Sequence, residues 1–123
     1  MEKCIYVVED NAQLREIIEF LLVEESYQVK AYPNVASFWK EMHRHIPDLI
    51  VLDVMLPDGN GMDICAKLKR DAKTHDIPVM MMSANNYLRT IKSKCPAEDF
   101  INKPFDINDF VNRVEQYVGA HSA

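Results

Sequence analysis

The chain has 123 residues, of which 48% are hydrophobic and 27% are charged, a composition typical of one globular domain with one core. Its net charge of −5 weighs against direct binding to DNA or RNA, which usually needs a basic face. No apolar run approaches the ~20 residues of a membrane span, and Glu2 and Lys3 lead directly into an apolar run rather than a signal peptide. We therefore expect a soluble, cytoplasmic protein with no membrane insertion.

The first half of the chain alternates strand-like and helical patterns. We expect a strand over 4–8 and, from the alternation of apolar and polar residues, an edge strand over 28–32. The helix between them has an apolar stripe formed by Leu14, Ile17, Ile18, Leu21 and Leu22. Asn34 can cap a second helix, which Pro47 ends. The stripe predicted for this second helix is Val35, Phe38, Trp39, Met42 and Ile46.

The second half continues the alternation. The expected elements are a strand over 49–52, a turn-rich loop over 57–61, a helix from about 62 to 72, a strand over 79–82, a weaker helix over 86–94 with Leu88 and Ile91 as core positions, and a strand over 99–102. Asp106 can cap the last helix, with the stripe Ile107, Phe110, Val111, Val114, Tyr117 and Val118.

Five strands alternating with five helices predict an α/β sandwich around a parallel sheet. The runs in the first, third and fourth strands are continuously apolar, as in strands that are covered on both faces. Ligands of such open sheets bind beyond the carboxyl ends of the strands. The polar residues that follow strands at this edge are Glu9, Asp10, Asp53, Ser83 and Lys103. The sequence therefore predicts that residues far apart in the chain converge on one site.

Three carboxylates at one edge repel one another, and a hard divalent cation with oxygen ligands relieves the repulsion. Mg²⁺ suits this site best, and no His or Cys is placed to make a zinc site. A cation beside Lys103 makes a pocket for a phosphoryl group, because phosphoryl transfer needs mainly positioning and charge neutralisation. A carboxylate that attacks phosphorus forms an acyl phosphate. Asp53, the single acid at the tip of a central strand, is the candidate nucleophile.

Four motifs occur in order along the chain: the pair Glu9-Asp10, Asp53 with Pro57 and Gly61 at +4 and +8, Ser83-Ala84, and Lys103-Pro104-Phe105 preceded by Phe100. Together they resemble the receiver domain of two-component response regulators over residues 3–119. The resemblance implies a flavodoxin-like (βα)5 three-layer sandwich with strand order 2-1-3-4-5. It also implies one receiver domain spanning 1–123.

The resemblance further implies a role for each position. Asp53 would accept phosphate from a phosphohistidine of a sensor kinase or phosphotransfer protein. The Mg²⁺ ligands would be Glu9, Asp10, Asp53 and the backbone carbonyl of Met55. Lys103 would pair with the phosphoryl oxygens, Ser83 would hydrogen-bond to them, and Phe100 would change rotamer as Ser83 moves. The resemblance also implies that the Lys103–Pro104 bond is one that is often cis, which X–Pro bonds permit at modest cost.

Such a receiver is a switch that assists its own phosphorylation and dephosphorylation, not a turnover enzyme. Its output face would be the fourth helix, fifth strand and fifth helix, acting on a downstream protein or an output domain. The interval from Ser83 to Lys103 is short, and 95–97 reads Cys-Pro-Ala where small residues are usual, so the signalling face is less well defined than the acceptor site. No output domain follows the last helix, which fits a complete shuttle or a piece of a larger regulator.

Three alternatives stay open. A receiver-like binding module would keep the fold and signal by protein contact without phosphorylation. An aspartate-nucleophile phosphatase commonly needs a second Asp two positions after the first, where this chain has Met55. A flavodoxin-like cofactor carrier shares the architecture, but the acidic loop Glu9-Asp10-Asn11 would repel a flavin phosphate.

Overall fold

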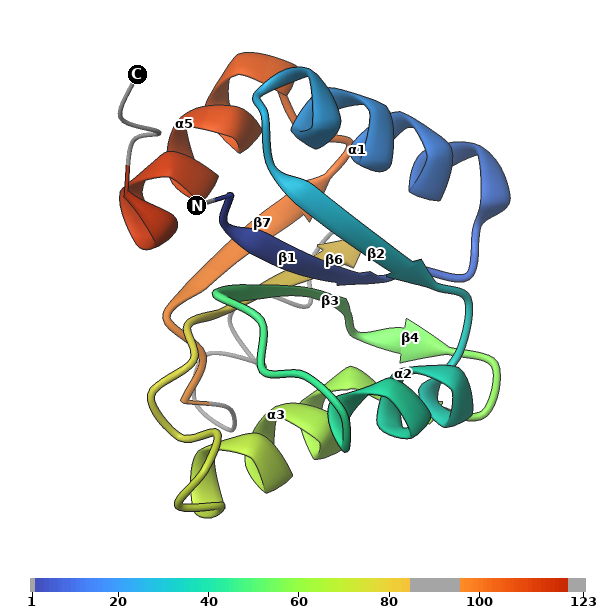
Figure 1. The fold of residues 1–123 in the computed structure, drawn as a ribbon. Helices are drawn as coiled ribbons and strands as arrows, with labels where there is room; N and C mark the ends of the chain where they lie inside the picture. Colours follow the sequence, from blue (N-terminus) through green and yellow to red (C-terminus); the bar gives the residue numbers. More distant parts are fainter. Residues whose placement is uncertain (1, 85–95, 120–123) are drawn as a thin grey trace.

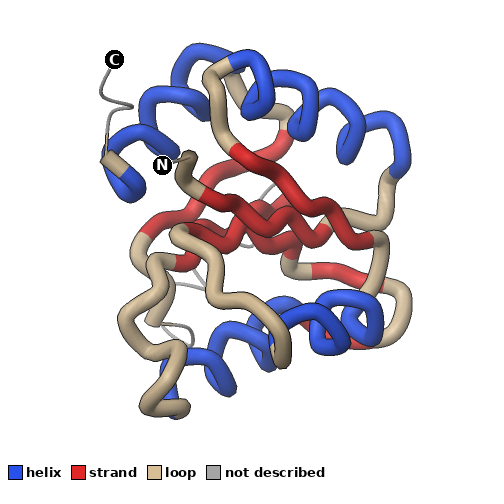
Figure 2. Tube along the Cα trace, in the orientation of Figure 1, coloured by secondary structure: helices blue, strands red, loops and turns tan. Residues whose placement is uncertain are grey.

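The computed structural model describes residues 2–84 and 96–119. Its centre is a five-stranded parallel sheet in the order β2-β1-β3-β6-β7, which lies between two layers of helices (Figure 1; Figure 2). The strands are β1 Cys4–Val8, β2 Gln28–Tyr32, β3 Leu49–Asp53, β6 Val79–Ala84 and β7 Asp99–Lys103. Counting these five strands along the chain gives the order 2-1-3-4-5, so the predicted fold class is confirmed.

Helices α1 (Ala12–Glu24) and α5 (Ile107–Val118) cover one face of the sheet, and α2 (Val35–Met42) and α3 (Gly61–Arg70) cover the other (Figure 1). Each begins after an Asn or Asp whose side chain accepts a backbone N–H of the first turn, which satisfies a donor that the helix itself cannot pair. These caps are Asn11, Asn34, Asn60 and Asp106. The predicted helix over 86–94, with Leu88 and Ile91, lies outside the described residues.

The sheet divides the buried side chains into two clusters, because successive residues of a strand point to opposite faces. Tyr6, Ile50 and Leu52 pack with Phe38 of α2 on one side. Val7, Val51 and Met82 pack with helices α1 and α5 on the other. All five residues of β1 except the first, and all five of β3, are buried. The predicted central position of these strands is therefore confirmed.

The buried faces of the helices are narrower than the predicted apolar stripes. Ile17, Ile46 and Ile107 are 48%, 57% and 51% exposed. Helix α1 meets the sheet through the row of Ile18 and Leu22, and Ile17 lies about 100° around the helix from Ile18, on the solvent side. Helix α2 ends at Met42, well before Pro47, so Ile46 lies beyond it. Ile107 is the first residue of α5 and precedes the turn that reaches the core.

Several element ends also differ from the prediction. Helix α3 ends at Arg70, because the Asp71 side chain accepts a hydrogen bond from the Lys73 N–H at 2.9 Å and turns the chain. Ser83 and Lys103 belong to their strands instead of following them, because the β6–β7 ladder continues through the pairs Ser83–Asn102 and Ala84–Lys103. Among the described residues, each helix is too short or too polar to cross a bilayer.

The segment after Asp53 was predicted as a turn-rich loop and instead forms a short antiparallel hairpin of β4 (Met55–Leu56) and β5 (Gly59–Asn60). The hairpin returns the chain to the sheet, where the Gly61 N–H donates to the Val54 carbonyl at 2.7 Å. A Cβ atom at Gly61 would overlap the Asp53 carbonyl oxygen. Glycine at 61 thus lets α3 start directly against the end of β3.

We predict that Gly61→Ala lowers the free energy of unfolding by about 1–3 kcal/mol, the usual cost of forcing extra atoms into filled space. The obstacle is backbone and cannot rotate away. Gly59→Ala is the matched control, since its Cβ would meet a methyl group of the Val35 side chain. Urea unfolding followed by circular dichroism measures both losses. An equal or larger loss in Gly59→Ala would contradict this explanation.

Candidate functional site

Among residues 2–84 and 96–119, four charged side chains meet at the carboxyl edge of the sheet. Glu9 and Asp10 follow β1, Asp53 ends β3 and Lys103 ends β7. One carboxylate oxygen from each of Glu9, Asp10 and Asp53 lies within 4.8 Å of the other two. Glu9 and Asp53 are buried, and Asp10 is exposed to solvent. The edge therefore holds three acids in one cluster that opens to solvent on the side of Asp10.

The parallel register brings the first two strand ends together. Val8 pairs with Leu52, so the next residues, Glu9 and Asp53, lie side by side at the ends of neighbouring strands. Local hydrogen bonds then hold Glu9 in place: its N–H donates to the Tyr32 carbonyl at 3.0 Å, and its Oε2 accepts the Asn11 N–H at 3.0 Å. The Glu9 side chain is thus positioned by its own loop as well as by the sheet.

Lys103 joins two of the acids. Its Nζ lies 2.6 Å from Glu9 Oε1 and 3.0 Å from Asp53 Oδ2. Burial by itself would lower the pKa of this amine, but the hydrogen bonds and charges of Glu9 and Asp53 outweigh burial and raise it. Lys103 therefore remains an ammonium ion and bridges the ends of β1 and β3 from the edge strand β7.

The pKa of Glu9 reflects the burial of this carboxyl beside a second acid. Burial raises the pKa of the Glu9 carboxyl, and the Lys103 ammonium only partly opposes this rise. The charge of Asp53 raises the pKa further. Within the part of the chain that the structure describes, the donor set consists of carboxylate oxygens with no imidazole or thiolate among them, which fits a hard cation such as Mg²⁺. A divalent cation at Glu9, Asp10 and Asp53 would offset the remaining negative charge.

The other residues singled out from the sequence lie around this cluster. Ser83 is buried, one position beyond Met82, which pairs with Asp53 in the ladder. The Ser83 Oγ makes a long 3.5 Å contact with the Ala84 carbonyl. Phe100 is half-buried and packs against the core on the α2–α3 side, about 10 Å along the strand from Lys103.

Two further features border the site. Met55, in β4, is largely exposed two residues after Asp53. The Lys103–Pro104 bond is cis, as expected. The structure thus brings Glu9, Asp10, Asp53 and Lys103 into one cluster, with Ser83 on the adjacent strand, whereas Phe100 lies farther back along β7.

Two residues near the site were not identified from the sequence. The Asp58 carboxylate, in the hairpin, accepts the N–H groups of Val35 at 2.8 Å and Ala36 at 3.0 Å, and these bonds lower its pKa. The Arg15 guanidinium donates to the Glu9 carbonyl at 2.9 Å. Pro57-Asp58-Gly59 is typical of a turn, and nothing in that pattern indicates that its Asp caps a helix 23 residues earlier.

A family model described as "Response regulator receiver domain" matches residues 5–115. The chain belongs to the response regulator receiver domain family. The chain is also similar to known proteins over nearly its whole length. PhoB of Klebsiella pneumoniae, a phosphate regulon transcriptional regulatory protein, is 38% identical over 117 residues, which cover 94% of this chain and 51% of PhoB. The receiver thus spans about half the length of the PhoB relatives it matches.

Solved receiver structures share the fold. The receiver domain of a signal transduction histidine kinase from Syntrophus aciditrophicus has a TM-score of 0.89 and 27% identity, over 98% of this chain and 92% of that one. The receiver domain of the sensor histidine kinase PA1611 from Pseudomonas aeruginosa has a TM-score of 0.85 and 22% identity, over 97% of this chain and 99% of that one. That second structure has a magnesium ion coordinated in its active-site cleft.

We predict that Glu9→Gln stabilises the metal-free receiver at neutral pH. The folded pKa of Glu9 is raised above its ordinary value of 4.5, so the unfolded chain releases this proton first as the pH rises. The free energy of unfolding of the wild type should therefore decrease as the pH rises from 4.5 to the raised pKa of Glu9. In Glu9→Gln the side chain is neutral at every pH, so this decrease should be absent. Melting temperature measured against pH in EDTA tests this.

The control for this experiment is Glu16→Gln, which neutralises an exposed carboxylate on α1. It should leave the pH dependence of the wild type unchanged. A Glu9→Gln variant that is less stable than wild type at neutral pH would show that the Lys103 ion pair, rather than burial, controls the energy of the Glu9 charge.

Proposed function

We propose that this receiver accepts a phosphoryl group on Asp53 from a phosphohistidine of a sensor kinase or phosphotransfer protein, in a Mg²⁺-dependent step. The observation that carries the proposal is the Lys103 ammonium in contact with both Glu9 and Asp53, beside the open carboxylate of Asp10. Among the candidate acids, Asp53 ends a fully buried central strand. The phosphohistidine would approach from the solvent side, where Asp10 is exposed.

In this reaction an Asp53 carboxylate oxygen forms a bond to phosphorus as the bond from phosphorus to the histidine nitrogen breaks. Bound Mg²⁺ would neutralise phosphoryl charge, and Glu9, Asp10, Asp53 and the Met55 carbonyl are its proposed ligands. Lys103 now contacts Asp53 Oδ2 at 3.0 Å and would transfer this contact to a phosphoryl oxygen. The site supplies mainly position and charge, which is what phosphoryl transfer requires.

The proposed switch uses residues next to the acceptor. The Ser83 hydroxyl has a weak 3.5 Å contact in this structure and would gain a strong acceptor in the phosphoryl group. Phe100 would change rotamer as Ser83 moves. The output face would combine β7 and α5 with the helix predicted over 86–94, a segment that lies outside the described residues. Phosphorylation would then act by favouring one of two arrangements of Ser83 and Phe100.

The proposal treats the chain as a switch and not as a turnover enzyme. Residues 1–123, with a core of about 3–119, would form a single receiver domain in the cytoplasm, where sensor kinases present their phosphohistidine. Its target would be a downstream protein or an output domain. The PhoB relatives are transcriptional regulators about twice as long as this chain, which supports an output domain as one such target. With a net charge of −5, the receiver would not bind nucleic acid directly.

We predict that acetyl phosphate with Mg²⁺ phosphorylates the wild type and that Asp53→Asn abolishes the product, because an amide cannot attack phosphorus. Phosphate-affinity gel electrophoresis separates the two forms. Asp63→Asn, at an exposed position in the first turn of α3, is the control and should be phosphorylated as the wild type is. Equal phosphorylation of Asp53→Asn and wild type would rule out Asp53 as the acceptor.

We predict that Asp10→Asn weakens Mg²⁺ binding at least about tenfold, since loss of an outer-shell partner alone typically costs that much. Asp10 is exposed, so the variant should keep the fold. Isothermal titration calorimetry measures the affinity, and Asp76→Asn, at a side chain that is 93% exposed and remote from the cluster in the sequence, is the control. Unchanged affinity in Asp10→Asn would place the cation elsewhere.

A further inference from the structure

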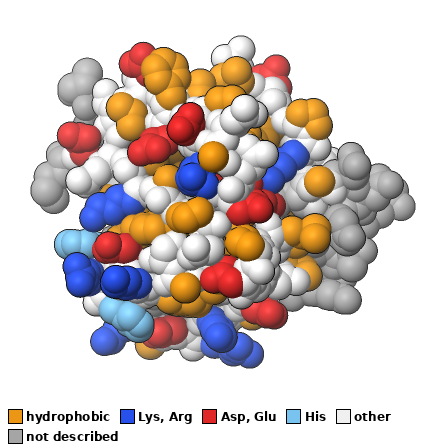
Figure 3. Space-filling view, turned by 90° about the vertical axis from the view of Figure 1, so that its right-hand side faces the viewer, with side chains coloured by type: hydrophobic (Ala, Val, Ile, Leu, Met, Phe, Trp, Pro, Cys, Tyr) orange, Lys and Arg blue, Asp and Glu red, His pale blue; other side chains and the backbone are white. Residues whose placement is uncertain are grey.

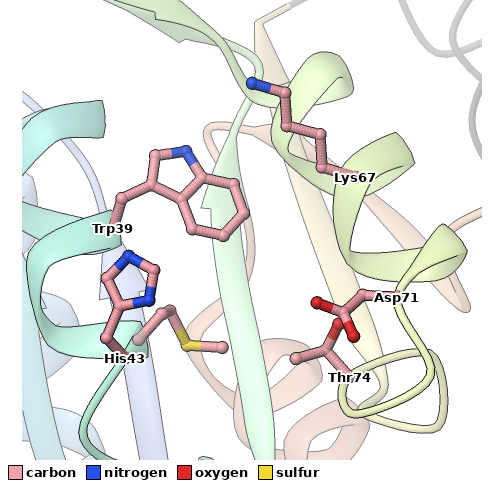
Figure 4. Close-up of a pocket in the computed structure, with 6 residues that line it drawn as sticks. Trp39, His43, Lys67, Asp71 and Thr74 are labelled. Atoms are coloured by element: carbon pink, nitrogen blue, oxygen red, sulfur yellow. The ribbon is translucent and has the colours of Figure 1, made fainter.

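A groove runs between α2 and α3 on the face of the sheet that these helices cover (Figure 4). It has a volume of about 340 Å³. Trp39 and His43 come from the α2 side, and Lys67, Asp71 and Thr74 face them from the α3 side (Figure 4). A second cavity of about 370 Å³ lies next to it, because Met42, His43, Asp71 and Thr74 line both. The two cavities together are called the α2–α3 groove below.

The α2–α3 groove is basic, although the chain as a whole carries a net charge of −5. Of the described residues, its walls hold three permanent cations, Arg44, Lys67 and Lys73, against the single carboxylate of Asp71. That carboxylate already accepts a hydrogen bond from the backbone N–H of Lys73 at 2.9 Å. In Figure 3, Lys, Arg and His side chains gather at the lower left, at the height of the α2–α3 layer. The charge of the groove therefore favours an anionic ligand.

The groove also offers an apolar surface. Trp39 is half-buried and packs edge-on against Phe38, with ring centroids 5.1 Å apart. Met42 is buried and lines the groove with Trp39, and Ile46, which is 57% exposed, lines the second cavity. An aromatic ring and a methionine between cations suit a ligand that combines one apolar side chain with several carboxylates.

A short peptide fits these features better than a nucleic acid does. Helix α2 has 8 residues and is therefore about 12 Å long, the length of roughly four extended residues. A nucleic acid would continue beyond the groove onto the acidic remainder of the molecule, where its phosphates would be repelled. A peptide segment can place its charges within the groove alone.

Both walls of the groove are anchored to the segment that follows Asp53. The Asp58 carboxylate holds the first turn of α2 through the N–H groups of Val35 and Ala36. Asn60 caps α3, its Oδ1 accepting the Met62 N–H at 2.7 Å. The hairpin that leaves the phosphoacceptor strand thus contacts the start of each helix that lines the groove.

We propose that the α2–α3 groove docks a short acidic segment of a partner protein. One apolar side chain of that segment would pack on Trp39 and Met42, and its carboxylates would pair with Lys67, Lys73 and Arg44. The hairpin would link this docking to the state of Asp53. The link rests on the proposed function, whereas the docking does not.

The docking is tested by selecting dodecapeptides from a random displayed library on the full chain. Enriched peptides should carry acidic residues around an apolar one. Labelled synthetic copies should bind with an affinity that Lys67→Glu lowers at least about tenfold, measured by fluorescence anisotropy. Lys3→Glu makes the same charge change at an exposed position outside the groove and should change affinity less than about twofold. Peptides without tryptophan should also shift the emission of Trp39, the single tryptophan of the chain.

Four results would overturn the docking. They are a library without enrichment, enriched peptides that are not acidic, equal effects of Lys67→Glu and Lys3→Glu, and displacement of the peptide by a random-sequence oligonucleotide at equal concentration. Self-association of the chain that Lys67→Glu abolishes would also overturn the docking, because a second copy of this chain would then occupy the groove. Sedimentation velocity detects such self-association.

The link is tested with beryllofluoride and Mg²⁺, which mimic a phosphorylated Asp53. Peptide affinity should change at least about threefold in the wild type, and less in Asp58→Ala and Asp58→Asn, which weaken the hairpin contact with α2. Fluorine NMR reports whether the mimic is bound. A bound mimic with unchanged peptide affinity would overturn the link. A mimic that does not bind would overturn the proposed function. It would leave the docking result on the free chain unaffected.

Discussion

The structure depends on the electrostatics of one sheet edge, where a single ammonium group contacts two buried carboxylates. Lys103 lies between Glu9 and Asp53, and Asp10 adds a third negative charge nearby. Among the described residues the cluster holds three carboxylates and one lysine, and burial together with the charge of Asp53 raises the pKa of Glu9 despite its contact with Lys103. The net negative charge of these four side chains makes the edge suitable for a divalent cation and, with that cation, for a phosphoryl group. Stability and the proposed chemistry are therefore in opposition at these positions.

The segment after Asp53 connects this edge to the rest of the molecule. It returns against the Asp53 carbonyl at Gly61, where a side chain would not fit, and it holds the start of α2 through Asp58. The hairpin thus connects Asp53 with the groove between α2 and α3. The output face of the proposed function lies instead on the side of β7 and α5. Helix α5 and the groove lie on opposite faces of the sheet (Figure 1), so two partners could occupy the two surfaces together.

The strands and the acidic cluster could be predicted because their signals are local. Leu49 to Leu52 are continuously apolar, as a strand covered on both faces must be, and parallel strands place their carboxyl ends at one edge. Element ends were less predictable, because ladder pairing with a neighbour carries Ser83 and Lys103 into strands. The exposure of Ile17 and Ile107 depends on where each helix lies over the sheet, which an apolar stripe does not specify.

The amino-acid order alone thus specifies the alternation of strands and helices, the caps Asn34 and Asp106, and the acids that end strands, because each follows from residues close together in the chain. The contacts of Lys103 with Glu9 and Asp53 join residues 94 and 50 positions apart, and register and side-chain reach decide them. The same holds for the Asp58 cap of α2 and for the basic groove, whose residues come from two helices and the loops after them. Such features arise when the sheet and helices pack, since packing alone determines which distant side chains become neighbours.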